Sequence, residues 1–187
     1  RHNDAVRHFV QYYQVRKCRL SQIYLSLGTN LEDRPANLQT ALAWLRRGVA
    51  VTAVSAVYET EPWGVLDQPA FLNLCVGGVT TLTPHELLQL CQSIETEVGR
   101  RPTYKWGPRL IDIDILFYDD QLIQDERLII PHPFVDERAF VLAPLADIAP
   151  DFVHPQSGET VVQMLARVYS TAVYRLPQQP NFQVMGD

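Results

Sequence analysis

One segment, residues 105–118, constrains the fold of this chain more than any other. It reads Lys-Trp-Gly-Pro-Arg-Leu-Ile-Asp-Ile-Asp-Ile-Leu-Phe-Tyr. Three β-branched isoleucines recur at every second position of its second half, which predicts a β-strand: Ile111, Ile113 and Ile115. Successive strand side chains point to opposite faces, so Asp112 and Asp114 share the face that the isoleucines do not use. The chain must therefore fold so that one face of this strand is buried and the other carries two carboxylates.

Two carboxylates on one face of an apolar strand repel each other unless a cation lies between them. Mg²⁺ prefers a few carboxylate oxygens together with phosphate and water, so a rigid Asp-x-Asp pair suits it. The alternative is an exposed edge strand with two solvated acids, which a bare Asp-x-Asp favours. The neighbouring residues change this balance, because Gly107-Pro108 predicts a turn that lets a loop fold over the site and Arg109 follows directly.

Composition places the chain among ordinary globular proteins. Its 187 residues are 47% hydrophobic and 20% charged, which fits one domain with a sizeable core. The formal net charge of −5 argues against a nucleic-acid or membrane-surface binder, since these need a basic excess. Three cysteines without metal-site spacing indicate reduced thiols and a cytoplasmic protein. No apolar run approaches the roughly 18 residues of a membrane span, and no signal-peptide pattern is present.

Hydrophobic periodicity and turn residues predict the order of elements along the chain. We expect strands at 23–27, 49–58, 71–81 and 111–118, helices from Arg34 to Gly48 and from Pro84 to Gly99, a short helix containing Arg138, Phe140 and Leu142, and a last helix at 160–168. Thr83-Pro84-His85-Glu86 is a capping box with proline at the first helical position.

This β-α-β-β-α-β order is that of a ferredoxin-like split βαβ protein. We expect an α+β fold in which two helices cover one face of an antiparallel sheet, with a C-terminal helical region appended. Residues 1–20 are predicted to be an N-terminal extension or linker, 21–174 one domain, and 175–187 an irregular tail.

Four arginines lie on three segments that border the central strand in this arrangement: Arg100, Arg109, Arg127 and Arg138. Guanidinium groups bind phosphate oxygens bidentately, although any single arginine is more often a surface residue. The sequence has neither a P-loop nor a Gly-x-Gly-x-x-Gly motif. A polyphosphate would therefore have to be held by metal and arginines.

The remaining candidates have two interpretations each. His132 lies between two prolines and is either a structural surface histidine or a hydrogen-bond donor to a phosphate or ribose oxygen. Trp63, Phe71, Trp106 and Phe140 could stack on a flat ring, but spacing alone assigns Phe71 and Phe140 to the core. Asn73 could read the edge of a heterocycle, because an amide offers a donor and an acceptor together.

With these segments in place, the chain resembles the 6-hydroxymethyl-7,8-dihydropterin pyrophosphokinase family of folate biosynthesis. The resemblance spans residues 23 to about 152 and rests on five segments in the family's order: 24–31, 58–64, 67–73, 105–109 with Asp112 and Asp114, and 130–133. The family pattern Arg-Trp-Gly-Pro-Arg-x-x-Asp-x-Asp is specific, and here only its first arginine is replaced, by Lys105.

The resemblance implies transfer of a pyrophosphoryl group from ATP to the hydroxymethyl oxygen of 6-hydroxymethyl-7,8-dihydropterin, leaving AMP. It implies that Asp112 and Asp114 hold two Mg²⁺ ions, while Arg100 and Arg109, on a mobile loop, neutralise charge as the bond to the α-phosphate breaks. The implied ATP-binding residues are Gln92, Glu95, Arg109, Ile115, Arg127, His132 and Arg138.

For the pterin, the resemblance implies a sandwich between Phe71 and Phe140, which reverses their assignment to the core. Its edge would be bound by Thr60, Asn73 and the backbone around Pro62 and Trp63, with Trp106 closing over it.

Some features depart from the family pattern. Many members have Tyr where Phe71 stands and Pro where Glu61 stands, and either Arg101 or Lys105 could be the second loop cation. Residues 1–20 have no match in the minimal family domain. Some relatives are fused to the preceding pathway enzyme, dihydroneopterin aldolase, and in such a fusion this extension would be a linker. Two other classes remain as alternatives: a ferredoxin-like module that binds a nucleotide or metabolite without turnover, and a metal-dependent phosphohydrolase.

Overall fold

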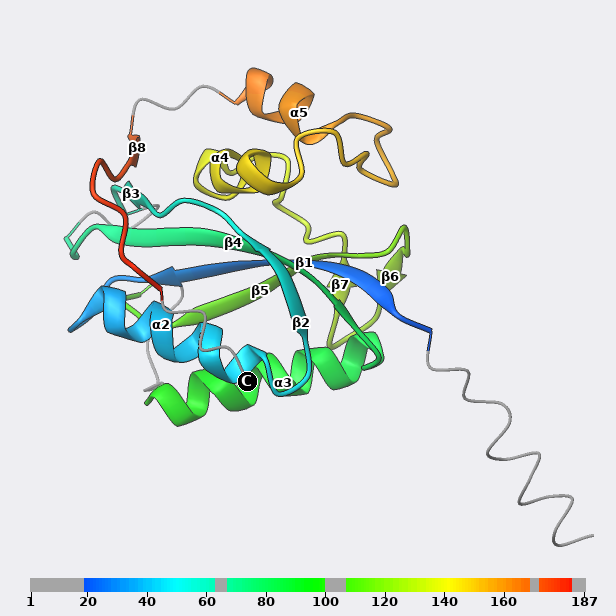
Figure 1. Ribbon diagram of the computed structural model, residues 1–187. Coiled ribbons are helices and arrows are strands. Elements are labelled where there is room, and N and C mark those ends of the chain that lie inside the picture. Colours follow the sequence, from blue (N-terminus) through cyan, green and yellow to red (C-terminus); the bar gives the residue numbers. More distant parts are fainter. Residues whose placement is uncertain (1–18, 63–66, 100–106, 169–171, 183–187) are drawn as a thin grey trace, which may run out of the picture.

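An antiparallel sheet of six strands forms the centre of the protein (Figure 1). The structure, a computed structural model, describes residues 19–62, 67–99, 107–168 and 172–182. The strands are β1 (Ser21–Thr29), β2 (Ala50–Val54), β3 (Tyr58–Thr60), β4 (Phe71–Thr80), β5 (Asp112–Tyr118) and β8 (Val173–Arg175). Their order in the sheet is β5-β1-β4-β3-β8, and β2 pairs with β4 as well. The strand predicted from the alternating isoleucines is confirmed as β5, but it lies at one end of the sheet order, beside β1, and not at the centre of the sheet as expected.

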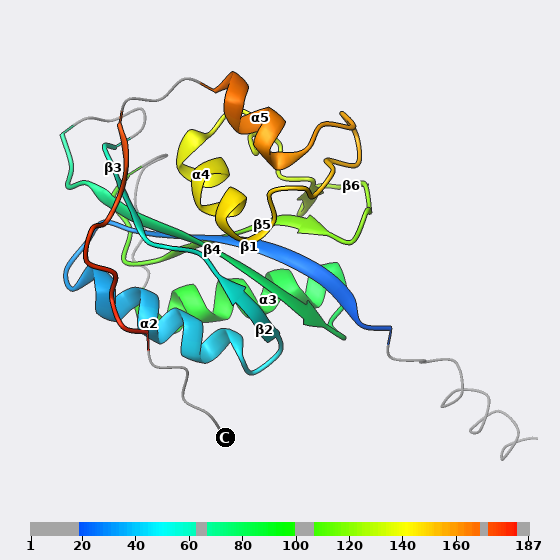
Figure 2. The same ribbon diagram turned by 45° about the horizontal axis from the view of Figure 1, so that its top comes forward.

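Helices cover both faces of this sheet (Figures 1 and 2). Helices α2 (Arg34–Leu45) and α3 (Pro84–Val98) pack on one face, while α4 (Ala139–Ile148) and α5 (Val161–Arg167) lie over the other. The molecule is an α+β protein, as expected, with the two early helices on the same face.

Strand alternation divides the apolar side chains between two cores. Ile23, Leu25 and Leu27 of β1 are fully buried in the core on the side of α2 and α3. Tyr24 of the same strand packs in the second core, under α4. The register between β1 and β5 shifts at Tyr24/Leu25, and this irregularity places the adjacent residues Leu116 and Phe117 together in the second core. The strict alternation read from the sequence therefore ends at Ile115.

Local capping fixes where the main helices begin and end. The Thr83–Glu86 capping box predicted from the sequence is confirmed: the Thr83 hydroxyl accepts from the Glu86 N–H, and the Glu86 carboxylate accepts from the Thr83 N–H. Gly99 ends α3 in the left-handed conformation, at φ 110°, which glycine adopts without strain. Asp33 caps α2 by accepting from the Ala36 N–H at 3.0 Å.

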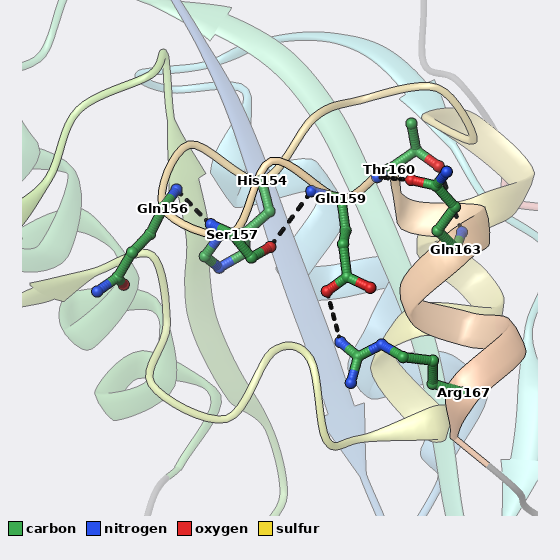
Figure 3. Close-up of polar contacts among 7 residues, drawn as sticks. All are labelled: His154, Gln156, Ser157, Glu159, Thr160, Gln163 and Arg167. Carbon is green, nitrogen blue, oxygen red and sulfur yellow. Dashed lines mark hydrogen bonds and ion pairs between the residues drawn. The ribbon is translucent and has the colours of Figure 1, made fainter.

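The loop before α5 folds around one histidine (Figure 3). Nδ1 of His154 accepts from the N–H groups of Gln156 and Ser157, each at 3.2 Å. The His154 N–H donates to the carbonyl of Glu159 at 2.8 Å. The Glu159 carboxylate pairs with Arg167 of α5 at 2.8 Å (Figure 3). A second capping box, Thr160 with Gln163, then starts the helix.

Three features differ from the expectations. The single strand predicted at 49–58 is wrong, because Ser55–Val57 interrupts it and leaves β2 and β3, both paired with β4. The side chain of Ser55 accepts from the Cys75 N–H at 2.8 Å and so holds this interruption against β4. Two further strands, β6 (Ile123–Gln124) and β7 (Ile129–Ile130), form a small hairpin. Arg138 is the N-cap of α4 and does not lie inside it.

The C-terminal segment packs against the sheet. β8 pairs with β3, so the domain boundary expected after residue 174 falls within a strand. Beyond it, the Leu176 N–H donates to the Val57 carbonyl at 3.0 Å. The Gln179 side chain accepts from the Val57 N–H at 2.6 Å and donates to its carbonyl at 3.3 Å. In the described part of the chain, no helix has the length and apolar character needed to cross a membrane.

Candidate active site

A cavity of about 430 Å³ lies where β1, β4 and β5 meet the start of α4. This volume is within the range of small-molecule sites. The side chains around it include most of the predicted site residues: Thr60, Phe71, Asn73, Gln92, Glu95, Arg109, Asp112, Asp114, His132, Arg138 and Phe140. The structure therefore brings together residues from β3, β4, α3, β5 and the segment that leads into α4.

The sheet register explains how the cavity is arranged. Gly28 on β1, which lies between β4 and β5, is opposite Asn73 of β4 on one side and Asp112 of β5 on the other. Two residues further back, Ser26 is opposite Asp114. Both β1 residues line the cavity and are small. They form a low floor with the acids on one side and the Asn73 amide on the other.

Asp112 and Asp114 lie side by side on this floor, as the strand pattern predicted. Their side chains are 33% and 38% exposed, so they are neither buried in the core nor turned fully to solvent. Arg109 forms an ion pair with Asp112, and Arg138 Nη1 lies 3.9 Å from Asp114 Oδ2. This half of the cavity combines carboxylates with guanidinium groups, the chemistry of a metal-bound polyphosphate site.

His132 faces Asp114 as a neutral ring. Its Nε2 lies 3.7 Å from Asp114 Oδ2, and its Nδ1 accepts from the Phe134 N–H at 3.2 Å. Burial lowers the pKa of His132 to about 4, the charge of Arg138 lowers it too, and Asp112 acts in the opposite direction. Since Nδ1 is the acceptor, the proton of the neutral ring is on Nε2. His132 thus offers a hydrogen-bond donor to the cavity near neutral pH.

The other half of the cavity combines aromatic rings with a buried amide. Phe71 and Phe140 both line it and are half-buried. The Asn73 side chain is buried and donates to the Thr60 hydroxyl at 2.7 Å. A Cβ on Gly28 would lie 2.9 Å from Asn73 Oδ1, so glycine is needed for this close approach. Flat apolar surfaces beside an oriented amide suit a planar heterocycle.

Glu95 connects α3 to the acidic strand. Its side chain is 3% exposed, and Oε1 accepts from the Ile113 N–H at 2.9 Å, between the two aspartates. This contact holds β5 against α3.

Asn30 links the two halves of the cavity. Its N–H and Oδ1 bond the backbone carbonyl and N–H of Arg109, at 3.0 and 2.8 Å. Its Nδ2 donates to the Gln68 side chain and to the Pro69 carbonyl, each at 3.0 Å. The segment that carries Arg109 is thereby tied to the segment that precedes Phe71. The sequence analysis included Asn30 only within the segment 24–31 and gave it no role.

Some predicted site residues lie away from the cavity lining. Ile115 is buried in the core on the α2 and α3 side, Arg127 is exposed on the β6–β7 hairpin connection, and Pro62 does not line the cavity. Trp63, Arg100 and Trp106 lie outside the described residues, as do the candidate loop cations Arg101 and Lys105. The cavity lining also includes Phe134, which the sequence analysis did not single out; its half-exposed ring follows the Pro-His-Pro motif.

Fold and site together define a class: an α+β protein whose six-stranded sheet supports an acidic, guanidinium-rich pocket beside an aromatic slot. The chain belongs to the 7,8-dihydro-6-hydroxymethylpterin-pyrophosphokinase (HPPK) family, whose model matches residues 24–150.

Curated relatives agree with this assignment. A 2-amino-4-hydroxy-6-hydroxymethyldihydropteridine pyrophosphokinase of Methylorubrum extorquens is 49% identical over 159 residues, which cover 84% of this chain and 99% of the relative. The protein of the same name from Bacillus subtilis is 50% identical over 127 residues, covering 67% of this chain and 76% of the relative.

Solved structures share the fold. A crystal structure of an HPPK-DHPS protein in complex with substrates has a TM-score of 0.66 at 17% identity, covering 78% of this chain. Wild-type HPPK-DHPS of Plasmodium falciparum with pteroate has a TM-score of 0.65 at 17% identity, covering 79%. The present chain spans less than half of these longer chains, 43% and 44%.

Proposed function

We propose that this protein transfers the pyrophosphoryl group of ATP to 6-hydroxymethyl-7,8-dihydropterin, releasing AMP, as a step of folate biosynthesis. For a member of this family, the main support for the proposal is the arrangement of side chains in the cavity. A single cavity holds the acids with their arginines and, across the Ser26–Gly28 floor, the Phe71–Phe140 slot with the Asn73 amide.

The acid pair fits Mg²⁺, and we propose that Asp112 and Asp114 hold two ions. Among the described residues, no group of three or more His, Cys, Asp or Glu side chains could form an all-protein metal cage. Mg²⁺ is usually bound by one or two carboxylates plus substrate phosphates and water, so two partly exposed aspartates match its needs. When bound, the metal would offset phosphate charge and hold the triphosphate for in-line transfer.

The proposed reaction forms a bond between the pterin hydroxymethyl oxygen and the β-phosphorus. The bond from that phosphorus to the α,β-bridging oxygen breaks, AMP leaves with this oxygen, and the pterin hydroxyl proton is released. Arg109 and Arg138 are placed to offset the charge that develops on the phosphates, and neutral His132 to donate from Nε2.

The remaining residues divide between the two substrates. We assign Gln92, Glu95 and Arg127 to the nucleotide side, with Ile115 near the adenine. We assign the pterin ring to Phe71 and Phe140, and its edge to Asn73 with Thr60. Pro62, Trp63 and Trp106 are assigned to the pterin side and Arg100 to charge neutralisation, as the family resemblance implies.

The fold can also be assigned to a narrower class. We propose a ferredoxin-like split βαββαβ arrangement with α4 and α5 as an appended helical region. The strand order β5-β1-β4, with β2 and β3 beyond β4, supports it. We also propose a cytoplasmic enzyme, consistent with the buried free thiols of Cys75 and Cys91, that works beside other enzymes of its pathway.

The experiment is an assay of AMP release from ATP and Mg²⁺, with and without 6-hydroxymethyl-7,8-dihydropterin. AMP that appears only with the pterin supports the proposal. Release of AMP or ADP without the pterin would instead indicate a phosphohydrolase. ATP binding without turnover under both conditions would indicate a binding module.

A further inference from the structure

Phe134 is the unassigned aromatic residue of the cavity lining. Its side chain is large and apolar yet 43% exposed, and it lines the cavity on the side of Asp114 and His132. The segment around it is well held: the Val135 N–H donates to the His132 carbonyl at 3.0 Å, and Val135 itself is buried in the core under α4. The position of the ring is therefore set by the fold.

The ring of Phe134 contacts the guanidinium group of Arg138. The guanidinium carbon of Arg138 lies 5.0 Å from the ring centroid of Phe134 and 5.6 Å from that of Phe140. Both distances are within the roughly 6 Å range in which a ring face attracts a cation. The same guanidinium lies 3.9 Å from Asp114 Oδ2.

A long arginine side chain loses much rotamer freedom when it is held in one orientation. Two ring faces restrict the Arg138 guanidinium before any substrate binds, and the cost of ordering it is then smaller when a phosphate arrives. The backbone N–H of Phe134 also keeps Nδ1 of His132 as an acceptor. That second contact is made by the main chain and survives substitution of the ring.

We propose that Phe134 is a positioning residue for ATP: its ring holds Arg138 toward the edge of the cavity at Asp114, where the polyphosphate is bound. This inference rests on the proposed function. It adds a residue that acts through Arg138 and has no contact with the pterin.

The test compares Phe134→Leu, which keeps apolar volume but loses the ring face, with Phe134→Tyr, which keeps both. Phe134→Leu should lower kcat/KM for ATP by about threefold to tenfold, and Phe134→Tyr should stay within about twofold of wild type. KM for the pterin should not change in either variant. In an Arg138→Met background, Phe134→Leu should cause no further loss, because the arginine through which the ring acts is gone.

The matched control is Trp44→Leu. Trp44 on α2 lies under the Arg47 guanidinium at 4.9 Å, a pair of the same kind that does not line the cavity. This variant should keep wild-type kinetics. Phe134→Met replaces Phe134→Leu if the leucine variant fails to fold, as judged by thermal unfolding.

Calorimetric binding of a non-hydrolysable ATP analogue with Mg²⁺ gives a readout that does not need turnover. Weaker binding by Phe134→Leu, with Phe134→Tyr unchanged, supports the inference. Wild-type behaviour of Phe134→Leu in both assays, or an equal loss in the Arg138→Met background, would overturn it. Failure of the wild-type protein to release AMP with the pterin would count against the proposed function alone.

Discussion

Gly28 shows at the scale of one residue how the floor of the cavity is made. It has β-strand neighbours on both sides, and the side chain of Asn73 approaches it to a distance that excludes even a methyl group. The Asn73 amide therefore sits directly against the backbone of β1, where its bond to Thr60 orients it.

Gly28→Ala should raise KM for the pterin by about tenfold or more, because the added Cβ displaces the Asn73 amide. The ATP affinity should change less. Gly77→Ala is the control: its Cβ would contact Tyr24 at 3.3 Å in the same sheet, and Gly77 does not line the cavity. Both variants are compared by steady-state kinetics and thermal unfolding, and an equal effect on pterin KM in both would contradict the role of Gly28.

His132 predicts a dependence of stability on pH. Its pKa is lowered from 6.5 to about 4 in the folded state, so the unfolded chain binds more protons between these values. Stability from this group is fully present above about pH 6.5 and is lost as the pH falls toward 4, by at most about 3 kcal/mol. Urea unfolding of wild type and His132→Gln across this range measures the effect. The difference between their unfolding free energies should shrink on acidification, and a constant difference would show that the histidine is not buried neutral.

The sequence was informative about residues whose role follows from local spacing. Asp112 and Asp114 share a face because strand side chains alternate, and three isoleucines at every second position predict this strand. Phe134 and Asn30 could not be assigned in this way. The role of Phe134 depends on a turn that brings its ring close to Arg138. The role of Asn30 depends on hydrogen bonds to residues 38 to 79 positions away in the sequence.

At the scale of elements, the same distinction explains which strands and helices were predicted. The capping box of α3 and the alternation of β1 are local signals, and both were confirmed. β3 and β8 have three residues each, too few for a periodic pattern, and they exist because they pair with β4 and with each other. Their formation is decided by distant partners.

The C-terminal segment contributes to the stability of this part of the sheet through Gln179. Gln179→Ala should lower the free energy of unfolding by about 1–3 kcal/mol, because it leaves the backbone of Val57 without its side-chain partner. Chemical denaturation measures the change. Gln124→Ala, at the exposed position of β6, is the matched control and should be within about 0.5 kcal/mol of wild type. A wild-type value for Gln179→Ala would mean that the segment packs without contributing to stability.

At the scale of the whole molecule, two cores on opposite faces of the sheet hold the elements that line the cavity. Each substrate should stabilise the folded protein by mass action when it binds to its own half of the cavity. ATP with Mg²⁺ should raise the melting temperature, and EDTA should remove most of that increase.

Asp112→Asn and Asp114→Asn should keep the fold and the melting temperature of the unliganded protein within a few degrees. They should lose the stabilisation by ATP with Mg²⁺ and lower turnover by orders of magnitude, because each removes a carboxylate from the preformed pair. Thermal unfolding with and without ligand, together with the AMP assay, measures both effects. Normal turnover in either variant would contradict the metal assignment.

The small residues of β1 have a consequence for how this protein can change. At Ser26 and Gly28 the floor of the cavity carries one hydroxyl side chain and one glycine, so both substrates would lie close to the main chain. A new side chain there would obstruct the nucleotide, the pterin or both, so altered preferences must come from the surrounding walls. Substitutions that change the preferred ligand, or that give resistance to an inhibitor that mimics one, should therefore occur in the walls of the cavity and not in its floor.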